Sequence, residues 1–175
     1  MIIKDKEFVK YISAQDLTGR ITELASAINT DYEDKRPLFI AILNGSFMFA
    51  ADLLKEVDVA CEISFVKVAS YEEMESSGNV KQLIELNEPI FNKDVIIIED
   101  IVDTGRTISK ILDEFLSLGA NSVEVITLLQ KPNSNELGDK IKYIGFDIPD
   151  AFVLGYGLDY DGLGRNLKDI YQLKV

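Results

Sequence analysis

The stretch VIIIEDIVDTGRTISKIL begins at Val95 and joins a buried-type strand to an amphipathic helix. Its first four residues, Val95–Ile98, are apolar, as is typical of a strand covered on both faces. Three carboxylates follow: Glu99, Asp100 and Asp103. In a parallel sheet, ligands bind beyond the carboxyl ends of the strands. These acids are therefore candidate site residues.

The turn Thr104-Gly105-Arg106-Thr107, which leads into the helix, has the composition of a small anion site. Backbone N–H groups at a helix N-terminus have no helical partner, and the helix dipole favours an anion there. Gly105 lets the backbone curl, and the two threonine hydroxyls add donors. We expect a monophosphate to bind here, although the Gly-x4-Gly-Lys pattern of a Walker loop is missing. The alternative is a strand that ends in surface acids, followed by an ordinary threonine cap.

The remaining sequence alternates apolar strands with helical patterns. Helical spacing of apolar residues predicts a helix over residues 15–29, and Gly119 is well placed to end a later helix. The last third has short strands broken by Gly and Pro and no long helix. We expect a parallel sheet covered by helices on both sides. Two strand–helix–strand units are predicted, over residues 38–43, 47–57 and 60–71, and over residues 95–98, 107–118 and 122–131.

Composition limits the classes of function. The chain has 175 residues, a net charge of −12 and no histidine. Its length predicts one domain over residues 1–175. The charge argues against generic binding to nucleic acid or to an anionic membrane. The lack of histidine excludes Ser-His-Asp and Cys-His pairs and imidazole zinc sites, so proton transfer is left to carboxylates, Lys, Tyr or water.

Targeting signals and disulfides are also not expected. No apolar run approaches the roughly 20 residues that span a bilayer, and the N-terminus lacks the layout of a signal peptide. Cys61 is the single cysteine, which excludes an intrachain disulfide and favours a reducing compartment, so a cytoplasmic location is expected. We expect Cys61 to be a buried, unreactive thiol within a strand.

Two acids, two apolar residues and then Asp-Thr-Gly-x-Thr resemble the signature of transferases that use phosphoribosyl pyrophosphate (PRPP). Nearly the whole chain is similar to one group of them, the hypoxanthine-guanine phosphoribosyltransferases. Asp103 favours that group, because relatives acting on other bases usually have a non-acidic residue there. Further ordered matches are Leu43-Asn44-Gly45-Ser46, Ser70-Tyr71, Lys131, the segment FVLGYGLDY at residues 152–160, and Arg165.

The resemblance implies a PRPP-transferase α/β fold, with a mostly parallel central sheet flanked by helices and a small hood formed by the terminal segments. It also implies transfer of the phosphoribosyl group to N9 of hypoxanthine or guanine, with Mg²⁺, in a homodimer or homotetramer. The implied acid or hydrogen-bond partner at purine N7 is Asp103. The other implied contacts are Glu99 and Asp100 for the ribose hydroxyls; Asp103, Thr104, Gly105, Arg106 and Thr107 for the 5′-phosphate; Asn44, Gly45, Ser70, Tyr71 and Arg165 for pyrophosphate; Lys131, Phe152, Val153 and Asp159 for the purine; and Glu99, Asp100 and Asp159 for Mg²⁺.

One departure and two alternatives accompany this interpretation. Many relatives carry Lys or Arg where this chain has Asn44, so backbone N–H groups are expected to meet pyrophosphate in that loop. The Leu43–Asn44 bond is a candidate cis peptide by the same resemblance. Residues 71–79 are expected to act as a lid.

The alternatives are a non-catalytic regulator that senses PRPP with the same fold, and a plain nucleotide-binding α/β domain. The sequence does not rank hypoxanthine, guanine and xanthine as substrates.

Overall fold

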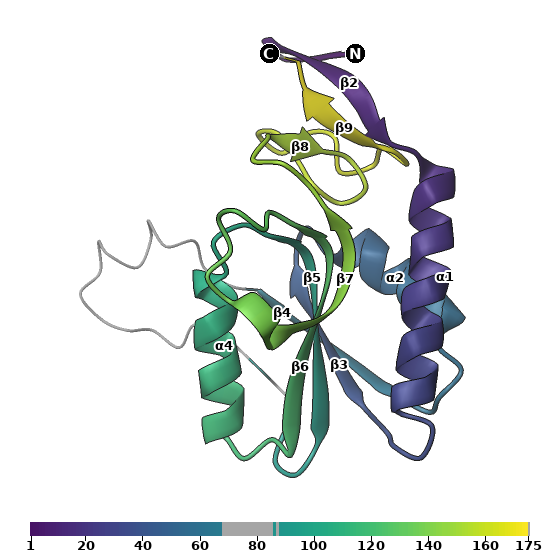
Figure 1. The fold of residues 1–175 in the computed structure, drawn as a ribbon, viewed down its shortest axis with the longest axis vertical. Coiled ribbons are helices and arrows are strands. Elements are labelled where there is room, and N and C mark those ends of the chain that lie inside the picture. Colours follow the sequence, from purple (N-terminus) through teal and green to yellow (C-terminus); the bar gives the residue numbers. More distant parts are fainter. Residues whose placement is uncertain (68–85, 87, 175) are drawn as a thin grey trace, which may run out of the picture.

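The central sheet has five parallel strands in the order β4-β3-β5-β6-β7 (Figure 1). A computed structural model of the chain describes residues 1–67, 86 and 88–174. Both predicted strand–helix–strand units are present, and the predicted helices and the parallel sheet are confirmed. The bounds are α1 Ala14–Asp31, β3 Leu38–Leu43, α2 Phe47–Glu56, β4 Glu62–Lys67, β5 Asp94–Val102, α4 Arg106–Ser117, β6 Ser122–Gln130 and β7 Ile141–Asp147.

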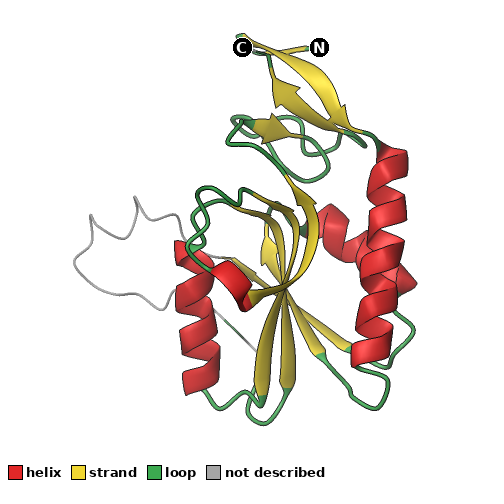
Figure 2. Ribbon diagram, viewed as in Figure 1, coloured by secondary structure: helices red, strands yellow, loops and turns green. Residues whose placement is uncertain are grey.

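Helices cover both faces of this sheet, α1 and α2 on one side and α4 on the other (Figures 1 and 2). Because side chains alternate along a strand, neighbouring residues of β5 enter different cores. Ile96 and Ile98 pack in the cluster with α1 and α2, whereas Val95 and Ile97 pack in the cluster with α4. All four are fully buried. This two-sided burial explains the continuous apolar run in the sequence.

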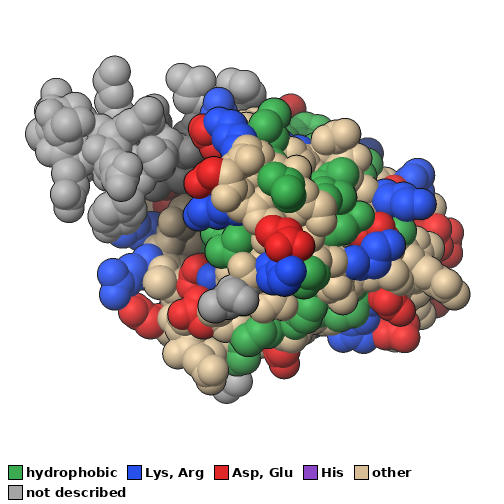
Figure 3. Space-filling model, turned by 90° about the horizontal axis from the view of Figure 1, so that it is seen from above, with side chains coloured by type: hydrophobic (Ala, Val, Ile, Leu, Met, Phe, Trp, Pro, Cys, Tyr) green, Lys and Arg blue, Asp and Glu red, His purple; other side chains and the backbone are tan. Residues whose placement is uncertain are grey.

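A second, antiparallel sheet lies beyond the carboxyl ends of the parallel strands and forms the hood (Figure 1). Both chain termini contribute to it, in agreement with the expected arrangement. Seen from this end, a broad area of hydrophobic side chains is interspersed with charges of both signs (Figure 3). Its strands, in the order β1-β2-β9-β8, are β1 Ile2–Ile3, β2 Lys6–Ile12, β9 Ile170–Leu173 and β8 Val153–Leu154.

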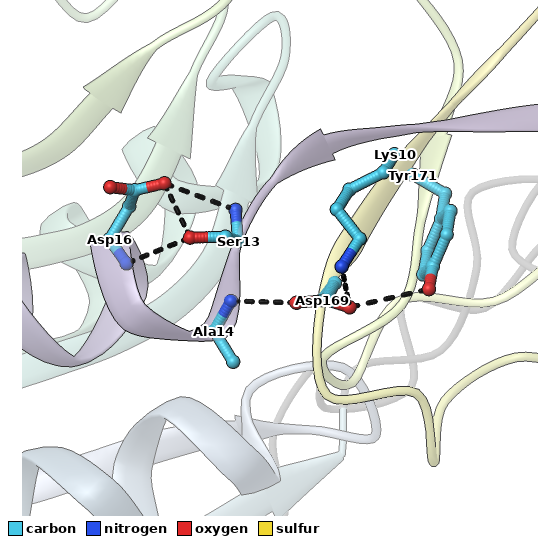
Figure 4. A network of polar contacts seen from close by, with 6 residues as sticks. All are labelled: Lys10, Ser13, Ala14, Asp16, Asp169 and Tyr171. Atoms are coloured by element: carbon cyan, nitrogen blue, oxygen red, sulfur yellow. Dashed lines mark hydrogen bonds and ion pairs between the residues drawn. The ribbon is translucent and has the colours of Figure 1, made fainter.

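Asp169 joins the hood to the first helix (Figure 4). Its side chain is 5% exposed and accepts hydrogen bonds from three groups. The N–H of Ala14, in the first turn of α1, donates to Oδ1 at 2.8 Å, and Lys10 Nζ of β2 lies 2.8 Å from Oδ2. The Tyr171 hydroxyl donates to Oδ2 at 3.3 Å. Beside it, Ser13 and Asp16 form a capping box that begins α1.

Two local predictions differ from the structure. The strand predicted over residues 95–98 continues to Val102, because Glu99 and Ile101 still pair with β6. The strand predicted from residue 60 begins at Glu62, so Cys61 lies one residue before it. Cys61 is half-buried rather than buried, and its partial burial raises the pKa of the thiol. In the described residues, no helix is both long and apolar enough to span a membrane.

Candidate active site

Glu99 and Asp100 lie in the last part of β5, where the sheet meets the hood. Burial raises the pKa of Glu99 well above its usual range, and the neighbouring Asp100 adds to this effect. Burial also raises the pKa of Asp100 to about 6, against hydrogen bonds from the N–H groups of Asp100 and Ile101. Among the described residues, Glu99 Oε2 has no hydrogen-bond partner although it is out of contact with water. Two half-buried acids with raised pKa values, one of which has an unpartnered oxygen, are placed to meet hydroxyl donors or a cation.

The turn after β5 forms a hollow of about 140 Å³ that Glu99 and residues 101–108 line. Gly105 has φ +78°, and a Cβ there would lie 2.5 Å from Cγ of Leu137. The backbone conformation therefore favours glycine, and a larger residue would also force the Leu137 side chain to move. The helix α4 begins directly after it, at Arg106. The expected coincidence of a curled turn and a helix N-terminus is present.

Residues 135–137 support this turn from the side, a role that the sequence did not indicate. The N–H of Glu136 donates to the carbonyl of Thr104 at 3.0 Å. Arg106 Nη2 lies 2.9 Å from Oε1 of Glu136. Asn135 Oδ1 accepts a hydrogen bond from the N–H of Leu137 at 2.8 Å. The guanidinium of Arg106 thus has a carboxylate partner beside the predicted phosphate turn.

Lys131, directly after β6, contacts Asp103, so two of the predicted purine-site residues lie together. Its Nζ lies 2.8 Å from Oδ2 of Asp103 and 3.2 Å from Oδ1 of Asp150. The side chain is 11% exposed, whereas those of Asp103 and Asp150 are 53% and 72% exposed. Burial alone would lower the pKa of Lys131, but the hydrogen bonds to both acids outweigh it and raise the pKa. Lys131 is therefore a charged donor, and Asp150 is a partner that the sequence did not reveal.

The loop between β3 and α2 packs on Asp100 by its backbone. The Leu43–Asn44 peptide bond is cis, as the resemblance suggested. A Cβ on Gly45 would lie 1.5 Å from Oδ2 of Asp100. Asn44 is exposed. The loop thus reaches the acids of β5 through a glycine, and a larger residue at this position would force the Asp100 carboxylate to move.

Arg165 contacts Gly157, whose backbone approaches Gly45 of this loop. Its Nη1 donates to the carbonyl of Gly157 at 2.7 Å, and its Nη2 lies 2.6 Å from Oδ1 of Asp159. The positive charge of Arg165 lowers the pKa of Asp100, and the charge of Asp159 raises it. Arg165, Asp159 and Asp100 therefore share one electrostatic environment, although Asp100 is far from the other two in the sequence.

Phe152 belongs to an aromatic cluster in the hood. Its ring lies 5.7 Å from that of Tyr160, nearly perpendicular, and 6.2 Å from that of Phe8 in β2. Lys6 Nζ lies 5.8 Å from the Phe152 ring centre. Phe152 is nevertheless 42% exposed, which leaves ring surface for a ligand. The adjacent Val153 is buried and pairs with Gln172 of β9.

Predicted residues Ser70 and Tyr71, and the predicted lid at residues 71–79, lie outside the described residues. In the described ranges, no group of three or more Asp, Glu or Cys side chains could hold a metal ion by itself. Glu99 and Asp100 nevertheless fit a bound cation, because the pKa of each carboxyl is raised and Glu99 Oε2 is buried without a partner among the described residues. Such a site suits Mg²⁺ that is held mainly by substrate oxygens and water.

Fold and site define a class of protein. The family model described as a phosphoribosyl transferase domain matches residues 11–161, and the chain belongs to this family. Among its relatives, the hypoxanthine-guanine phosphoribosyltransferase of Staphylococcus epidermidis is 45% identical over 165 residues, which cover 94% of this chain and 92% of that protein. The protein of that name from Bacillus subtilis is 40% identical over 164 residues, 93% of this chain and 91% of that one.

Solved structures agree with the sequence comparison. A hypoxanthine-guanine phosphoribosyltransferase from Bacillus anthracis has a TM-score of 0.88 at 36% identity, with 97% of this chain and 100% of that chain covered. A hypoxanthine phosphoribosyltransferase from Trypanosoma cruzi, in a ternary substrates complex, has a TM-score of 0.86 at 33% identity, over 98% and 97% of the two chains. The expected fold and the resemblance to this group of enzymes are confirmed. These relatives give no support to the alternative of a non-catalytic regulator.

Proposed function

We propose that this chain transfers the 5-phosphoribosyl group of PRPP to N9 of hypoxanthine, guanine or both. The products are inosine or guanosine monophosphate and pyrophosphate, a step of purine salvage. The observation that carries the proposal is the contact between Lys131 Nζ and Asp103 Oδ2 at 2.8 Å. It joins a donor suited to the 6-oxo oxygen of a purine with an acceptor suited to the neighbouring N7.

The purine end of the site works by matched hydrogen bonds. Lys131 donates to the 6-oxo group, while Asp103 accepts the N7 proton or a hydrogen bond from it as N9 attacks the anomeric carbon. Adenine would present an amine to Lys131, so that two donors face each other. Buried polar groups are then left unpaired, and this discriminates strongly against adenine. Phe152 stacks on the ring, and the backbone near Val153 and Asp159 contacts the other edge.

The sugar and the phosphates bind to the residues beside the purine site. Glu99 and Asp100 accept hydrogen bonds from the two ribose hydroxyls, and the turn from Asp103 to Thr107 holds the 5′-phosphate at the start of α4. Gly45 and Asn44 offer N–H groups to pyrophosphate. Arg165 is expected to turn its guanidinium from Asp159 to pyrophosphate, for which its fork geometry is suited. Ser70 and Tyr71 complete the pyrophosphate set.

Mg²⁺ is the proposed cofactor, and when bound it neutralises charge on the leaving pyrophosphate. Glu99, Asp100 and Asp159 would hold it, largely through water and substrate oxygens. This role is compatible with contacts to ribose, because each carboxylate has two oxygens. The family uses Mg²⁺ with PRPP. We also propose that residues 1–175 act as one domain, in the cytoplasm, as a homodimer or homotetramer.

The test is nucleotide formation with PRPP, Mg²⁺ and each of hypoxanthine, guanine, xanthine and adenine in turn. We expect pyrophosphate release with at least one of hypoxanthine and guanine, and little turnover of adenine. Binding of nucleotide without pyrophosphate release would instead indicate a plain nucleotide-binding domain. Binding of PRPP without turnover of any base would indicate a regulator.

A further inference from the structure

Tyr156 has an unusual backbone conformation within the segment that carries the proposed purine contacts. Its φ is +51°, and the flanking Gly155 and Gly157 have φ of +99° and +102°. A left-handed conformation is uncommon for a bulky residue and persists where the surroundings hold it. The N–H of Tyr156 donates to the carbonyl of Leu167 at 2.8 Å, and the N–H of Gly157 donates to that of Arg165 at 2.9 Å. The loop is thus fixed on its hood side.

The side chain of Tyr156 fixes the same loop on the opposite side. It is 5% exposed, and its hydroxyl donates to Oδ2 of Asp52 in α2. Lys55 Nζ lies 2.6 Å from Oδ1 of the same carboxylate. Burial raises the pKa of Asp52, but hydrogen bonds from Lys55 and Tyr156 outweigh it and lower the pKa. The acceptor is therefore charged, and hydrogen bonds to charged acceptors are among the stronger ones.

Asp52 is rigidly connected to the loop that precedes its helix. The helix α2 begins at Phe47, directly after Asn44, Gly45 and Ser46. Ser46 is buried, and its hydroxyl donates to the carbonyl of Ile42 at 2.5 Å. The N–H of Ala50 donates to the carbonyl of Ser46 at 2.8 Å. A residue that is held against Asp52 is therefore also held in place relative to Gly45.

The two loops meet backbone to backbone. A Cβ on Gly157 would lie 2.0 Å from the carbonyl oxygen of Gly45. The two backbone segments therefore approach as closely as glycine allows. We propose that the hydrogen bond from Tyr156 to Asp52 holds Gly157 against Gly45 and so keeps the purine-binding segment in register with the pyrophosphate loop. Tyr156 is on this account a positioning residue for both substrates. The proposal rests on the proposed function, which supplies the two substrates.

Tyr143 provides a matched control for Tyr156. It is a buried tyrosine whose hydroxyl donates to Asp31 Oδ2 at 2.7 Å, and Lys142 Nζ lies 3.1 Å from that same oxygen. Both tyrosines thus bind a carboxylate that is also paired with lysine. Tyr143 lies on β7 and Asp31 at the end of α1, away from both loops. Tyr143→Phe and Tyr156→Phe therefore remove the same chemistry from different places.

The experiment compares the two variants by steady-state kinetics, calorimetric binding of PRPP and thermal unfolding. We expect both to lower Tm, but only Tyr156→Phe to raise KM for PRPP and for the purine, each by about 3- to 10-fold, with kcat little changed. Equal KM values in the two variants would overturn the proposal, and so would a fall in kcat with both KM values unchanged. PRPP affinity should weaken in Tyr156→Phe but not in Tyr143→Phe, a readout that needs no turnover.

Substitutions at Asp52 test the same contact from the other side. Asp52→Asn keeps an oxygen that can accept from Tyr156, whereas Asp52→Leu removes it. We expect KM values near wild type in Asp52→Asn and values like those of Tyr156→Phe in Asp52→Leu. Equal KM values in the two Asp52 variants would contradict the role of the hydrogen bond. If wild-type protein binds PRPP but forms no nucleotide with any base, the proposed function fails, and the binding comparison still decides the role of Tyr156.

Discussion

Lys131 and Asp103 form an ion pair at the site where we propose that the purine base binds. Two acids bind the same ammonium group, so its charge is retained despite burial, and the raised pKa of Lys131 expresses this balance. A charged lysine is a strong donor to a carbonyl oxygen, and Asp103 uses only Oδ2 for Lys131. This combination of donor and acceptor is why we propose that the pair recognises two neighbouring atoms of one base.

Asp103→Ala is predicted to lower kcat by about 10²- to 10⁴-fold, the usual effect of losing general acid–base help. Asp150→Ala is its control, because Asp150 contacts the same Nζ but is more exposed. We expect kcat in Asp150→Ala to stay within severalfold of wild type, with both variants folded by circular dichroism. Near-normal turnover of Asp103→Ala would remove this residue from the mechanism.

Lys131→Ala is predicted to weaken the preference for 6-oxopurines over adenine. The reason is that the variant lacks the donor that rejects an amine at that position. The measurement is the ratio of kcat/KM for hypoxanthine to that for adenine, in variant and wild type. Selectivity against adenine that matched wild type would show that another group makes the distinction.

At the scale of elements, the unit formed by β5, its turn and α4 was largely predictable. The apolar run, the three acids and the helical spacing each have a local signal. The length of β5 had no local signal. Charged residues are depleted in strands, so the acids suggested an end at Ile98. In the structure, Glu99 continues the ladder opposite Thr127, a buried residue of β6. Tertiary pairing thus overrode local propensity where the site is formed.

Contacts between distant segments could not be predicted from spacing. Arg106 meets Glu136 across 30 residues, and Tyr156 meets Asp52 across 104 residues. No spacing or motif links the two members of either pair, so only the fold brings the partners together. The types of group at the candidate site were visible in the sequence, while the residues that hold them were not.

Gly105→Ala is predicted to destabilise the protein more than Gly162→Ala. The two glycines have nearly equal φ, +78° and +79°, so the backbone penalty of about 1–2 kcal/mol is shared. A Cβ on Gly105 meets Leu137, whereas one on Gly162 has no atom within 4 Å. Overpacking adds about 1–3 kcal/mol to the first variant alone. Urea unfolding measures the difference, and equal losses would show that Leu137 moves away freely.

At the scale of the whole molecule, the hood is built from both ends of the chain and carries Phe152 and Val153, two of the proposed purine contacts. Its antiparallel pairing of β2 with β9 joins residues more than 150 positions apart, for example Phe8 with Leu173. The sequence indicated this hood only through the family resemblance, because short strands broken by glycine have weak local signals. Asp169 then connects β9, β2 and the start of α1 through one buried carboxylate (Figure 4).

Asp169→Asn is predicted to lower stability at neutral pH, because a neutral amide is a weaker acceptor for Lys10 and the N–H of Ala14. Hydrogen bonds from Lys10 and Ala14 lower the pKa of Asp169 below 3.8 in the folded protein, so its stabilisation is present above that value and is lost as pH falls through the folded pKa. The difference in Tm between wild type and variant should therefore be constant from about pH 5 to 8 and shrink below about pH 4. Asp161→Asn is the control, since Asp161 pairs with Lys4 in the open and should matter little at any pH. A difference for Asp169→Asn that persisted unchanged at acid pH would show that its charge does not hold the hood.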